Sequence, residues 1–231
     1  MSPFLKKHRA SIISFGIALS LAMFFRVFAV SLYKVPTSSM LPNLYVGDII
    51  LGYKLPYQFF SKTISSVLPG VFSDLKRGDV VIFRHPKTSV FYVKRILGLG
   101  GDKIILNEQG ITVNGEILGR KSGENNFDFV GSNYYESFIE SVGANSYGIL
   151  LRKNESLDLV DKEFSVGPGE IFVVGDNRDS SDDSRDWGPV PVENIVAKVN
   201  KVVLSFQWSG SQSSKIRFDR LWVDLDESNA R

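Results

Sequence analysis

The sequence predicts an all-β protein that carries an N-terminal transmembrane helix and a small, irregular inserted subdomain. Three observations support this class. An apolar stretch near the N-terminus is long enough to span a bilayer as a helix. After it, short runs of β-branched and aromatic residues alternate with turn residues. Beyond the apolar stretch, the chain lacks the clear 3.6-residue periodicity that amphipathic helices show.

The composition excludes several classes of function. The chain has 231 residues, of which 27 are basic and 25 acidic, and a net charge of +2 gives no electrostatic case for nucleic acid. It has no cysteine, which excludes disulfides, thiolate zinc sites and a cysteine nucleophile. Two separated histidines, His8 and His85, leave only carboxylates for a metal site. We therefore expect no metal, no cofactor and no nucleic-acid partner.

Residues 10–32 are predicted to be an uncleaved membrane anchor. A helix of this length, at about 1.5 Å per residue, covers the roughly 30 Å hydrocarbon core. The single charge within it, Arg26, lies near its far end, where a long side chain can reach the interface. Basic residues precede the stretch, so the positive-inside rule leaves residues 1–9 in the cytoplasm and everything after residue 32 outside it. No second apolar run of this length follows, so one span is expected.

Two alternatives to an anchor remain open. A cleaved signal peptide fits the basic start, and Ala29-Val30-Ser31 resembles a small-x-small cleavage site. Against it, the uncharged run at residues 10–25 is at the long limit for such a peptide, and Arg26 separates this run from the site. A buried core helix is the other alternative, but no apolar residues are missing elsewhere in the chain.

The rest of the chain is predicted to form a β domain from residues 33–118 and 167–231. Asn114-Gly115 is a strong signal for a type I′ turn between two of its strands. Residues 119–166, rich in Asn, Ser, Gly and Glu, are expected to form the irregular inserted subdomain. Residues 53–75 are either a ribbon that touches membrane or a partner, or a partly packed loop. The expected strands lie at residues 45–51, 79–84, 90–99, 103–106, 111–113, 116–118, 170–174 and 195–206.

The scarcity of histidine points to a lysine as the base for any serine nucleophile. His8 lies on the cytoplasmic side of the predicted anchor, and His85 lies in a predicted hairpin turn, where a surface position is expected. A lysine acts as a base only when it is neutral near pH 7. Its reference pKa of about 10.4 must then fall by roughly 3 units, which corresponds to about 4 kcal/mol. Desolvation among apolar groups can lower the pKa in this way.

Lys94 is the lysine whose surroundings fit. It lies in the apolar run FYVKRIL at residues 91–97, where strand alternation places it on one face with Tyr92 and Ile96. Arg95 then faces either solvent or an acidic partner. The alternative is that Lys94 only extends to solvent along its own stem or forms an ion pair.

Two polar segments could hold the rest of a site. In VPTSSMLPNL at residues 35–44, three hydroxyl residues lie between two prolines, which suits either a polar linker or a nucleophile. The segment GDNRDSSDDSRDWG at residues 175–188 follows an apolar run, and its acids and arginines favour a rigid, salt-bridged loop. A solvated turn or a calcium loop is the alternative, although the spacing of an EF-hand is not met.

Four segments, in order along the chain, resemble type I signal peptidase, the bacterial leader peptidase family. They are VPTSSMLPNLYVGDIIL (35–51), RGDVVIF (77–83), YVKRILGLGGDKI (92–104) and GDNRDSSDDSRDWGPVP (175–191). The resemblance implies the β core that signal peptidases share with LexA-like peptidases. It also implies a serine endopeptidase, anchored in the bacterial inner (plasma) membrane, that removes signal peptides from exported preproteins after small residues at positions −1 and −3.

The resemblance also implies roles for individual residues. Ser39 corresponds to the nucleophile and Lys94 to its general base, which together form a Ser-Lys dyad. The hydroxyl of Thr37 and the backbone N–H of Ser39 correspond to the oxyanion hole. Ser181 matches the serine that orients the lysine amine. The charged residues expected to brace the catalytic β domain around this dyad are Asp176, Arg178, Asp183 and Arg185. The implied substrate-binding wall comprises Tyr33, Val35, Met40, Leu44, Ile50, Tyr92 and Val93.

Two departures from the family pattern concern the segment around the nucleophile. Ser38 stands where glycine is usual, which narrows the allowed backbone angles. Thr37 stands where serine is frequent, and threonine keeps the hydroxyl. The implied partners are preprotein signal peptides, membrane lipid and the secretion translocon. Two other interpretations remain: a self-cleaving peptidase of the LexA type, which would lack the anchor, and a catalytically silent, membrane-anchored binding module.

Overall fold

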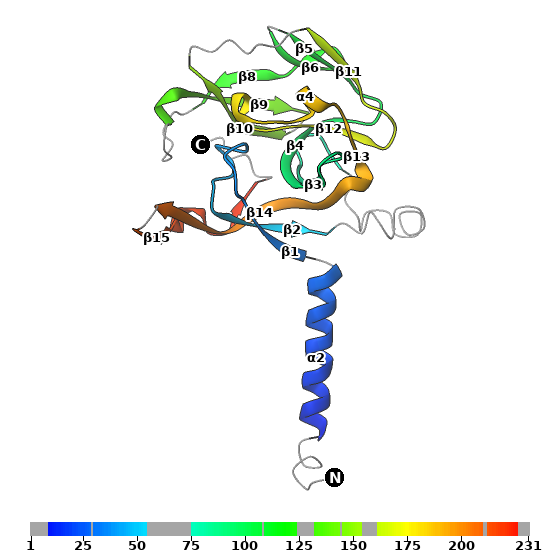
Figure 1. Ribbon diagram of the computed structural model, residues 1–231, viewed down its shortest axis with the longest axis vertical. Coiled ribbons are helices and arrows are strands. Elements are labelled where there is room, and N and C mark those ends of the chain that lie inside the picture. The colour runs from blue at the N-terminus through cyan, green and yellow to red at the C-terminus, as the bar shows by residue number, and fades with distance from the viewer. Residues whose placement is uncertain are drawn as a thin grey trace.

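The computed structural model describes residues 9–28, 30–54, 75–107, 109–123, 132–143, 145–153, 161–209 and 212–225. Its folded body consists of β-sheets, and one long helix extends away from them (Figure 1). The predicted all-β class is therefore confirmed for the described part of the chain. Most of the predicted insertion at residues 53–75 lies outside the described residues, as do parts of the one at residues 119–166.

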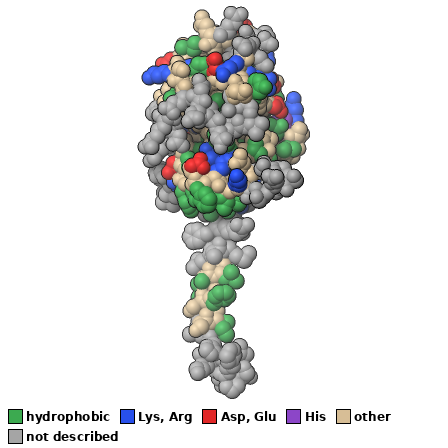
Figure 2. All heavy atoms as spheres, turned by 90° about the vertical axis from the view of Figure 1, so that its left-hand side faces the viewer, with side chains coloured by type: hydrophobic (Ala, Val, Ile, Leu, Met, Phe, Trp, Pro, Cys, Tyr) green, Lys and Arg blue, Asp and Glu red, His purple; other side chains and the backbone are tan. Residues whose placement is uncertain are grey.

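Helix α2 (Arg9–Phe28) covers most of the predicted apolar stretch. Its side chains at residues 11–20 are exposed, and Figure 2 shows apolar side chains along this part. Strand β1 begins at Val30, so the last residues of the 10–32 stretch are extended rather than helical. Among the residues that the structure describes, no helix combines the length and apolarity that a membrane span requires.

The largest sheet has nine strands in the order β1-β2-β14-β3-β4-β12-β13, with β15 and β16 paired to β14. Strand β14 pairs with β3 and then with β2, and its register shifts along both pairings. Such bulges bend a strand and increase its twist, so the long β14 curls the sheet (Figure 1). The bounds are β1 (Val30–Lys34), β2 (Asp48–Tyr53), β3 (Val80–Arg84), β4 (Phe91–Leu99), β12 (Glu170–Val174), β13 (Val190–Pro191), β14 (Ile195–Ser209), β15 (Gln212–Ile216) and β16 (Val223–Asp224).

Two smaller sheets complete the β structure. One has the order β11-β5-β6-β7, with β5 (Lys103–Asn107), β6 (Gly110–Val113), β7 (Glu116–Ile117) and β11 (Lys162–Ser165). The other has the order β10-β9-β8, with β8 (Gly119–Ser122), β9 (Tyr135–Val142) and β10 (Asn145–Arg152). The turn between β6 and β7 has Asn114 at φ 51° and Gly115 at φ 86°, as the predicted type I′ turn requires.

The segment at residues 119–166 is more regular than the sequence predicts. It contains the antiparallel β8-β9-β10 sheet, and its last strand, β11, pairs with β5. Only some inward positions of β9 and β10 are buried, so their apolar alternation is weak in the sequence although the strands pair along their whole length. Strand pairing by the backbone therefore supplies a regularity that the side-chain pattern does not reveal.

Strand β3 shows how the core is divided. Its residues Val80, Val81, Ile82 and Phe83 are all buried because both of its faces are covered. Val80 and Ile82 face one cluster, which includes Val35, Met40, Leu44, Ile50 and Val199, while Val81 and Phe83 face another, which includes Ile96, Ile171 and Val173. A third cluster includes Leu97, Ile104, Ile111, Ile149 and Phe172. Short helical turns connect strands: η1 (Ser132–Tyr134), η2 (Arg178–Ser180), α4 (Ser184–Trp187), η3 (Val192–Asn194) and η4 (Phe218–Arg220).

Candidate active site

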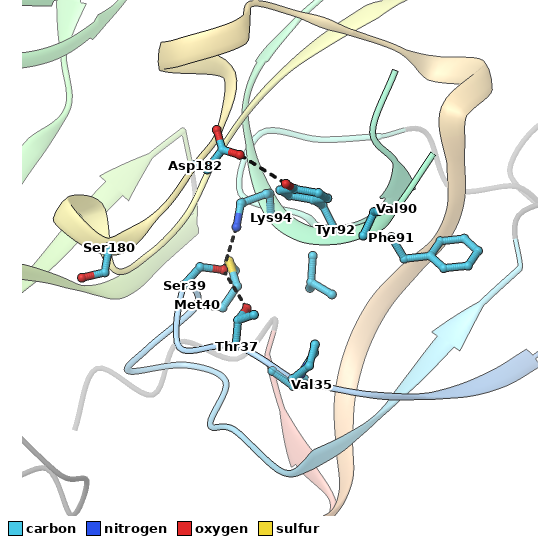
Figure 3. Close-up of a pocket in the computed structure, with 12 residues that line it drawn as sticks. Val35, Thr37, Ser39, Met40, Val90, Phe91, Tyr92, Lys94, Ser180 and Asp182 are labelled. Carbon is cyan, nitrogen blue, oxygen red and sulfur yellow. Dashed lines mark hydrogen bonds between the residues drawn. The ribbon is translucent and has the colours of Figure 1, made fainter. Parts of the chain in front are cut away.

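Ser39 is held on a short turn between β1 and β2. Met40 and Leu44, which follow it, are buried in the core, and the Leu44 N–H donates to the Met40 carbonyl at 2.8 Å. From the opposite side, the Asn177 backbone N–H donates to the Ser39 carbonyl at 3.1 Å, and the Asn177 side-chain amide donates to the Ser38 carbonyl at 3.2 Å. These contacts leave the hydroxyl of Ser39, whose residue is 9% exposed, facing the cleft (Figure 3).

Lys94 reaches this hydroxyl from strand β4. Its Nζ atom lies 2.6 Å from Ser39 Oγ and donates a hydrogen bond to it (Figure 3). The residue is only 3% exposed, and the Tyr92 ring centre lies 5.5 Å from Nζ. The structure thus brings together the two residues that the sequence singles out as nucleophile and base.

Burial changes the protonation of Lys94. The loss of hydration lowers its pKa to about 8, although the negative charges of Asp183, Asp176 and Asp182 oppose this shift. This is a smaller fall than the roughly 3 units expected from the sequence. A pKa of about 8 leaves about a tenth of the amine neutral at pH 7 and most of it neutral above pH 9. The amine can therefore accept a proton in mildly alkaline solution.

Thr37 lies beside the Ser39 hydroxyl. Its Oγ1 atom is 3.4 Å from Ser39 Oγ, and the residue is exposed to the cleft (Figure 3). Within the part of the chain that the structure describes, no acceptor is paired with the Ser39 N–H. A hydroxyl and a free backbone N–H are the two kinds of donor that an oxyanion hole uses.

Asp183 organises the loop opposite Ser39. Burial alone would raise its pKa, but the Arg185 guanidinium and several hydrogen bonds hold the pKa of this carboxyl below its usual value. Arg185 Nε donates to it at 2.7 Å, the Gly175 N–H at 2.8 Å and the Ser181 hydroxyl at 2.6 Å. The expected Asp183–Arg185 pair is therefore present. Among the described hydrogen bonds none joins Ser181 to Lys94, so the expected contact between these two residues is not formed.

Gly175 is a site residue that the sequence interpretation missed. A Cβ atom at this position would lie 2.2 Å from Ser181 Oγ and 2.6 Å from the Ser39 carbonyl oxygen. Real Cβ atoms do not approach other atoms so closely, so the loop and the Ser39 turn can meet only if residue 175 is glycine. The signal available in the sequence was a glycine that follows the apolar run of β12.

The charged residues next to the site are buried in pairs. Arg95, 3% exposed, donates twice to Asp176, with both distances 2.8 Å, so Arg95 has the acidic partner foreseen from the sequence. Arg178 forms a bidentate ion pair with Glu140 of β9. A buried charge that loses its partner is costly. These pairs therefore fix the loop after β12 to β4 and to the β10-β9-β8 sheet. Glu140 was not foreseen, because it lies far from Arg178 in the sequence.

An open cleft of about 360 Å³ lies beside Ser39 and Lys94. Of the predicted wall residues, it is lined by Val35, Met40, Tyr92 and Val93. Leu44 and Ile50 are instead fully buried in the core cluster beneath Met40, and Tyr33 packs against that cluster. The remaining lining residues, which the wall prediction did not include, are Pro36, Thr37, Val90, Phe91, Ser180 and Asp182. The prediction therefore mixed the cleft with the layer of core beneath it.

One edge of β4 is open beside this cleft. Strand β3 pairs with β4 from Phe91 to Arg95, whereas β12 pairs with it only from Arg95 to Leu99. On the β12 side, the stretch Phe91–Lys94 therefore has no strand partner among the described residues. The free N–H and C=O groups of such an edge can pair with an extended peptide.

His85 differs from its expected position. The sequence predicts a surface residue in the β3–β4 turn, but His85 is 6% exposed. Its ring centre lies 5.2 Å from that of Tyr92 and 5.0 Å from that of Trp187, and its Nδ1 accepts the N–H groups of Lys87 and Thr88. The imidazole is buried because it packs beneath the aromatic rings and closes its own turn. The structure thus gives it a role in folding the hairpin.

A hydroxyl held against a buried amine, at the wall of a cleft with an open strand edge, is an arrangement that suits the hydrolysis of an extended peptide. Comparisons with known proteins agree. The model of the family described as signal peptidase, peptidase S26, matches residues 8–204. The chain therefore belongs to the signal peptidase family, peptidase S26, and is a serine endopeptidase.

Two relatives within this family come from Pseudomonas species. Signal peptidase I of Pseudomonas fluorescens is 35% identical over 205 residues, which cover 84% of this chain and 71% of the relative. Signal peptidase I of Pseudomonas aeruginosa is 34% identical over 226 residues, covering 91% and 77%. A crystal structure of a signal peptidase I from Enterococcus faecalis aligns with a TM-score of 0.37 and 25% identity, covering 54% of this chain and 96% of that one.

Proposed function

We propose that this protein is a membrane-anchored signal peptidase that cleaves exported preproteins after small residues at −1 and −3, with Ser39 as nucleophile and Lys94 as base. The observation that carries the proposal is the 2.6 Å contact between Lys94 Nζ and Ser39 Oγ in a site where Lys94 is almost fully buried. The family membership supports the peptidase activity, and the geometry supports the choice of residues.

In the first half of the reaction, neutral Lys94 takes the proton of the Ser39 hydroxyl as its oxygen attacks the scissile carbonyl carbon. The negative charge that develops on the carbonyl oxygen is stabilised by the Ser39 N–H and the Thr37 hydroxyl. Protonated Lys94 then donates its proton to the leaving amine. The carbon–nitrogen bond breaks, the mature protein leaves, and the signal peptide stays bound to Ser39 as an ester.

In the second half, Lys94 is neutral again and removes a proton from a water molecule that attacks the ester. The same two donors stabilise the second oxyanion. Lys94 returns its proton to the Ser39 oxygen as the ester bond breaks, which releases the signal peptide and regenerates the enzyme. The ion pair of Asp183 with Arg185 supports this cycle by fixing the loop that packs against the Ser39 turn.

The open edge of β4 explains how the substrate would bind. An extended peptide that pairs with Phe91–Lys94 places its carbonyl groups along the cleft. Alternate side chains of a strand point the same way, so residues −1 and −3 enter the same wall. The lining on that side includes Val35, Met40 and Val93, which leaves shallow, apolar space for small side chains.

The proposed location rests on α2 and on the apolar stretch that contains it, although within the described residues no helix by itself combines the length and apolarity of a membrane span. We place α2 in the bacterial inner (plasma) membrane as a single span, with the N-terminus in the cytoplasm and the β domain outside it. The exposed apolar side chains of Ile13, Phe15 and Ile17 support contact with lipid. In this position the cleft would meet preproteins as they leave the secretion translocon, which makes lipid and translocon the partners of the proposed enzyme.

The test uses the purified full-length chain in detergent micelles with a preprotein substrate. S39A and K94A are expected to abolish cleavage, while S38A and K103A are the matched controls. Ser38 and Lys103 are both exposed, and the Lys103 ammonium forms a surface ion pair with Glu163. N-terminal sequencing of the product locates the cleaved bond. Cleavage by S39A or K94A at the rate of the parent chain would refute the proposed dyad, and a parent chain that leaves every preprotein intact would refute the proposed substrate.

A further inference from the structure

Asp182 brings a negative charge to the cleft. It lies in the loop between η2 and α4, it is exposed, and its carboxylate Oδ2 accepts a hydrogen bond from the Tyr92 hydroxyl at 3.2 Å (Figure 3). Both residues line the cleft that also contains Ser39 and Lys94. In Figure 3, Asp182 lies on one side of the Ser39–Lys94 pair and Val35 on the other.

This charge is not neutralised in the way that the other carboxylates of the site are. Asp183 is paired with Arg185 and Asp176 with Arg95. Asp182 has no cationic partner among the described residues, and its polar contact is the neutral Tyr92 hydroxyl. Among the described residues that line the cleft, Asp182 and Lys94 are the charged ones. When Lys94 is neutral and reactive, Asp182 is therefore the single charge that a bound substrate meets there.

We propose that Asp182 is a specificity-determining residue, which favours a basic substrate side chain close to the scissile bond and disfavours an acidic one. This inference rests on the proposed function. A peptide paired with Phe91–Lys94 has its scissile carbonyl at Ser39, so the side chains on either side of that bond lie in the same cleft as Asp182. Residues −1 and −3 point toward the Val35 wall, so the alternate residues, −2 and +1, point away from it.

The expected size of the charge preference follows from the exposure of Asp182. Asp182 is exposed, and an exposed ion pair changes an equilibrium or rate by about two- to fivefold. Such an interaction is screened by salt, with a Debye length of about 10 Å at 0.1 M ionic strength. The preference should therefore shrink as salt is added, which a preference due to shape would not do.

The experiment compares peptides that differ only by Lys, Gln or Glu at −2 or +1. The kcat/KM of each is measured with the full-length protein in neutral detergent, at low ionic strength and pH 9. The parent chain is expected to prefer Lys over Glu at one of these positions. D182N should remove this preference and D182K should reverse it. D186N is the matched control, because Asp186 lies four residues further along, in α4, and is exposed but does not line the cleft. It should keep the preference.

The Lys-to-Glu ratio of kcat/KM is taken within one variant. A lower fraction of active protein therefore lowers both values equally and does not change the ratio. A Lys-to-Glu ratio that is the same in the parent chain and in D182N at every position would overturn the inference and leave the proposed function intact. Loss of the preference in D186N as well as D182N would also overturn it, since a general loss of negative charge would then be the cause. If the parent chain cleaves none of the peptides, including those with Gln, the proposed function fails and the inference fails with it.

Discussion

At the scale of single residues, the site depends on the environment of one amine. Lys94 is an ordinary lysine in the sequence, and its chemistry changes because β4 carries it into the protein, where its charge is poorly solvated. In the proposed mechanism, Ser39 gains its base in the same way, because the fold places its hydroxyl beside this amine. Neighbouring residues of the same type, such as Ser38 and Ser39, thus differ in the setting of their side chains: Ser39 Oγ accepts a hydrogen bond from Lys94, whereas Ser38 is exposed.

The first prediction concerns pH. Only the neutral amine of Lys94 can act as a base, and deprotonation increases as the pH passes its lowered pKa of about 8. Cleavage should therefore rise with pH, by about tenfold per unit well below the pKa, and level off above it. The measurement is kcat/KM for a peptide without ionisable side chains. A flat profile from about pH 5 to 9 would contradict a titrating lysine base.

The second prediction concerns the oxyanion donor. T37V keeps the shape of the side chain but removes the hydroxyl that lies 3.4 Å from Ser39 Oγ. Its kcat should fall by about 10²–10³, the usual cost of one lost donor. T37S, which keeps a hydroxyl, should stay active. Thr37 is exposed, so the unfolding midpoint of T37V should match that of the parent chain. Full activity of T37V would remove Thr37 from the oxyanion hole.

At the scale of elements, the site forms where three separate segments meet: the turn after β1, strand β4 and the loop after β12. Their contacts leave little space. The turn and the loop touch at Gly175, and Asn177 clamps two carbonyl groups of the turn. The loop is in turn attached to β9 by the Arg178–Glu140 pair. Substitutions that alter these contacts should therefore change the geometry of Ser39 and Lys94, even where the substituted residue contacts neither side chain.

Gly175 gives the third prediction. In G175A, a methyl group meets the Ser39 carbonyl and the Ser181 hydroxyl, so the turn and the loop must separate. Overpacking of this kind costs about 1–3 kcal/mol, and cleavage should fall strongly because the Ser39 hydroxyl moves. G119A is the control, because a Cβ at Gly119 meets nothing within 4 Å. The unfolding midpoint and kcat are measured for both variants. A fully active G175A would show that the turn does not depend on this contact.

Glu140 gives the fourth prediction. In E140Q, the Arg178 guanidinium, 2% exposed, loses its counter-charge. The free energy of unfolding should fall by about 3–5 kcal/mol, as for other buried pairs that lose one partner. E163Q breaks the Lys103–Glu163 pair, in which both side chains are more than half exposed, and should cost less than about 1 kcal/mol. Urea unfolding measures both values. Equal losses of unfolding free energy in E140Q and E163Q would contradict the conclusion that burial makes the Arg178–Glu140 pair more important than the surface pair.

At the scale of the whole molecule, α2 and the β domain differ in where their apolar side chains lie. The helix extends away from the sheets (Figure 1). Its described side chains include exposed apolar ones, while the β domain has three buried apolar clusters. An apolar surface of this kind is costly in water, so it should have a partner. In the proposed function that partner is lipid, and the site is held at one face of the membrane.

This division gives the fifth prediction. In cells, the full-length chain should stay with the membrane fraction after extraction at alkaline pH, which releases peripheral proteins. The double substitution I13D and I17D in α2 should release the protein from the membrane fraction, because each added charge is costly in hydrocarbon. The pair I117D and F218D, at exposed apolar positions of the β domain, is the control. A parent chain found entirely in the soluble fraction would contradict the anchor.

The sequence by itself determined the local features. The apolar stretch of α2, the β-branched runs, the type I′ turn and the apolar setting of Lys94 are properties of neighbouring residues, and short-range patterns report them well. Family-specific segments added the candidates Ser39 and Lys94.

The tertiary structure alone decided the distances between distant segments. It placed Ser39 within 2.6 Å of a lysine 55 positions away, sent Leu44 and Ile50 into the core, buried His85 and joined Glu140 to Arg178. Each of these results depends on strand order and register, which are set by the sum of many long-range contacts. No single stretch of sequence contains that sum, so a pattern of neighbours cannot show it.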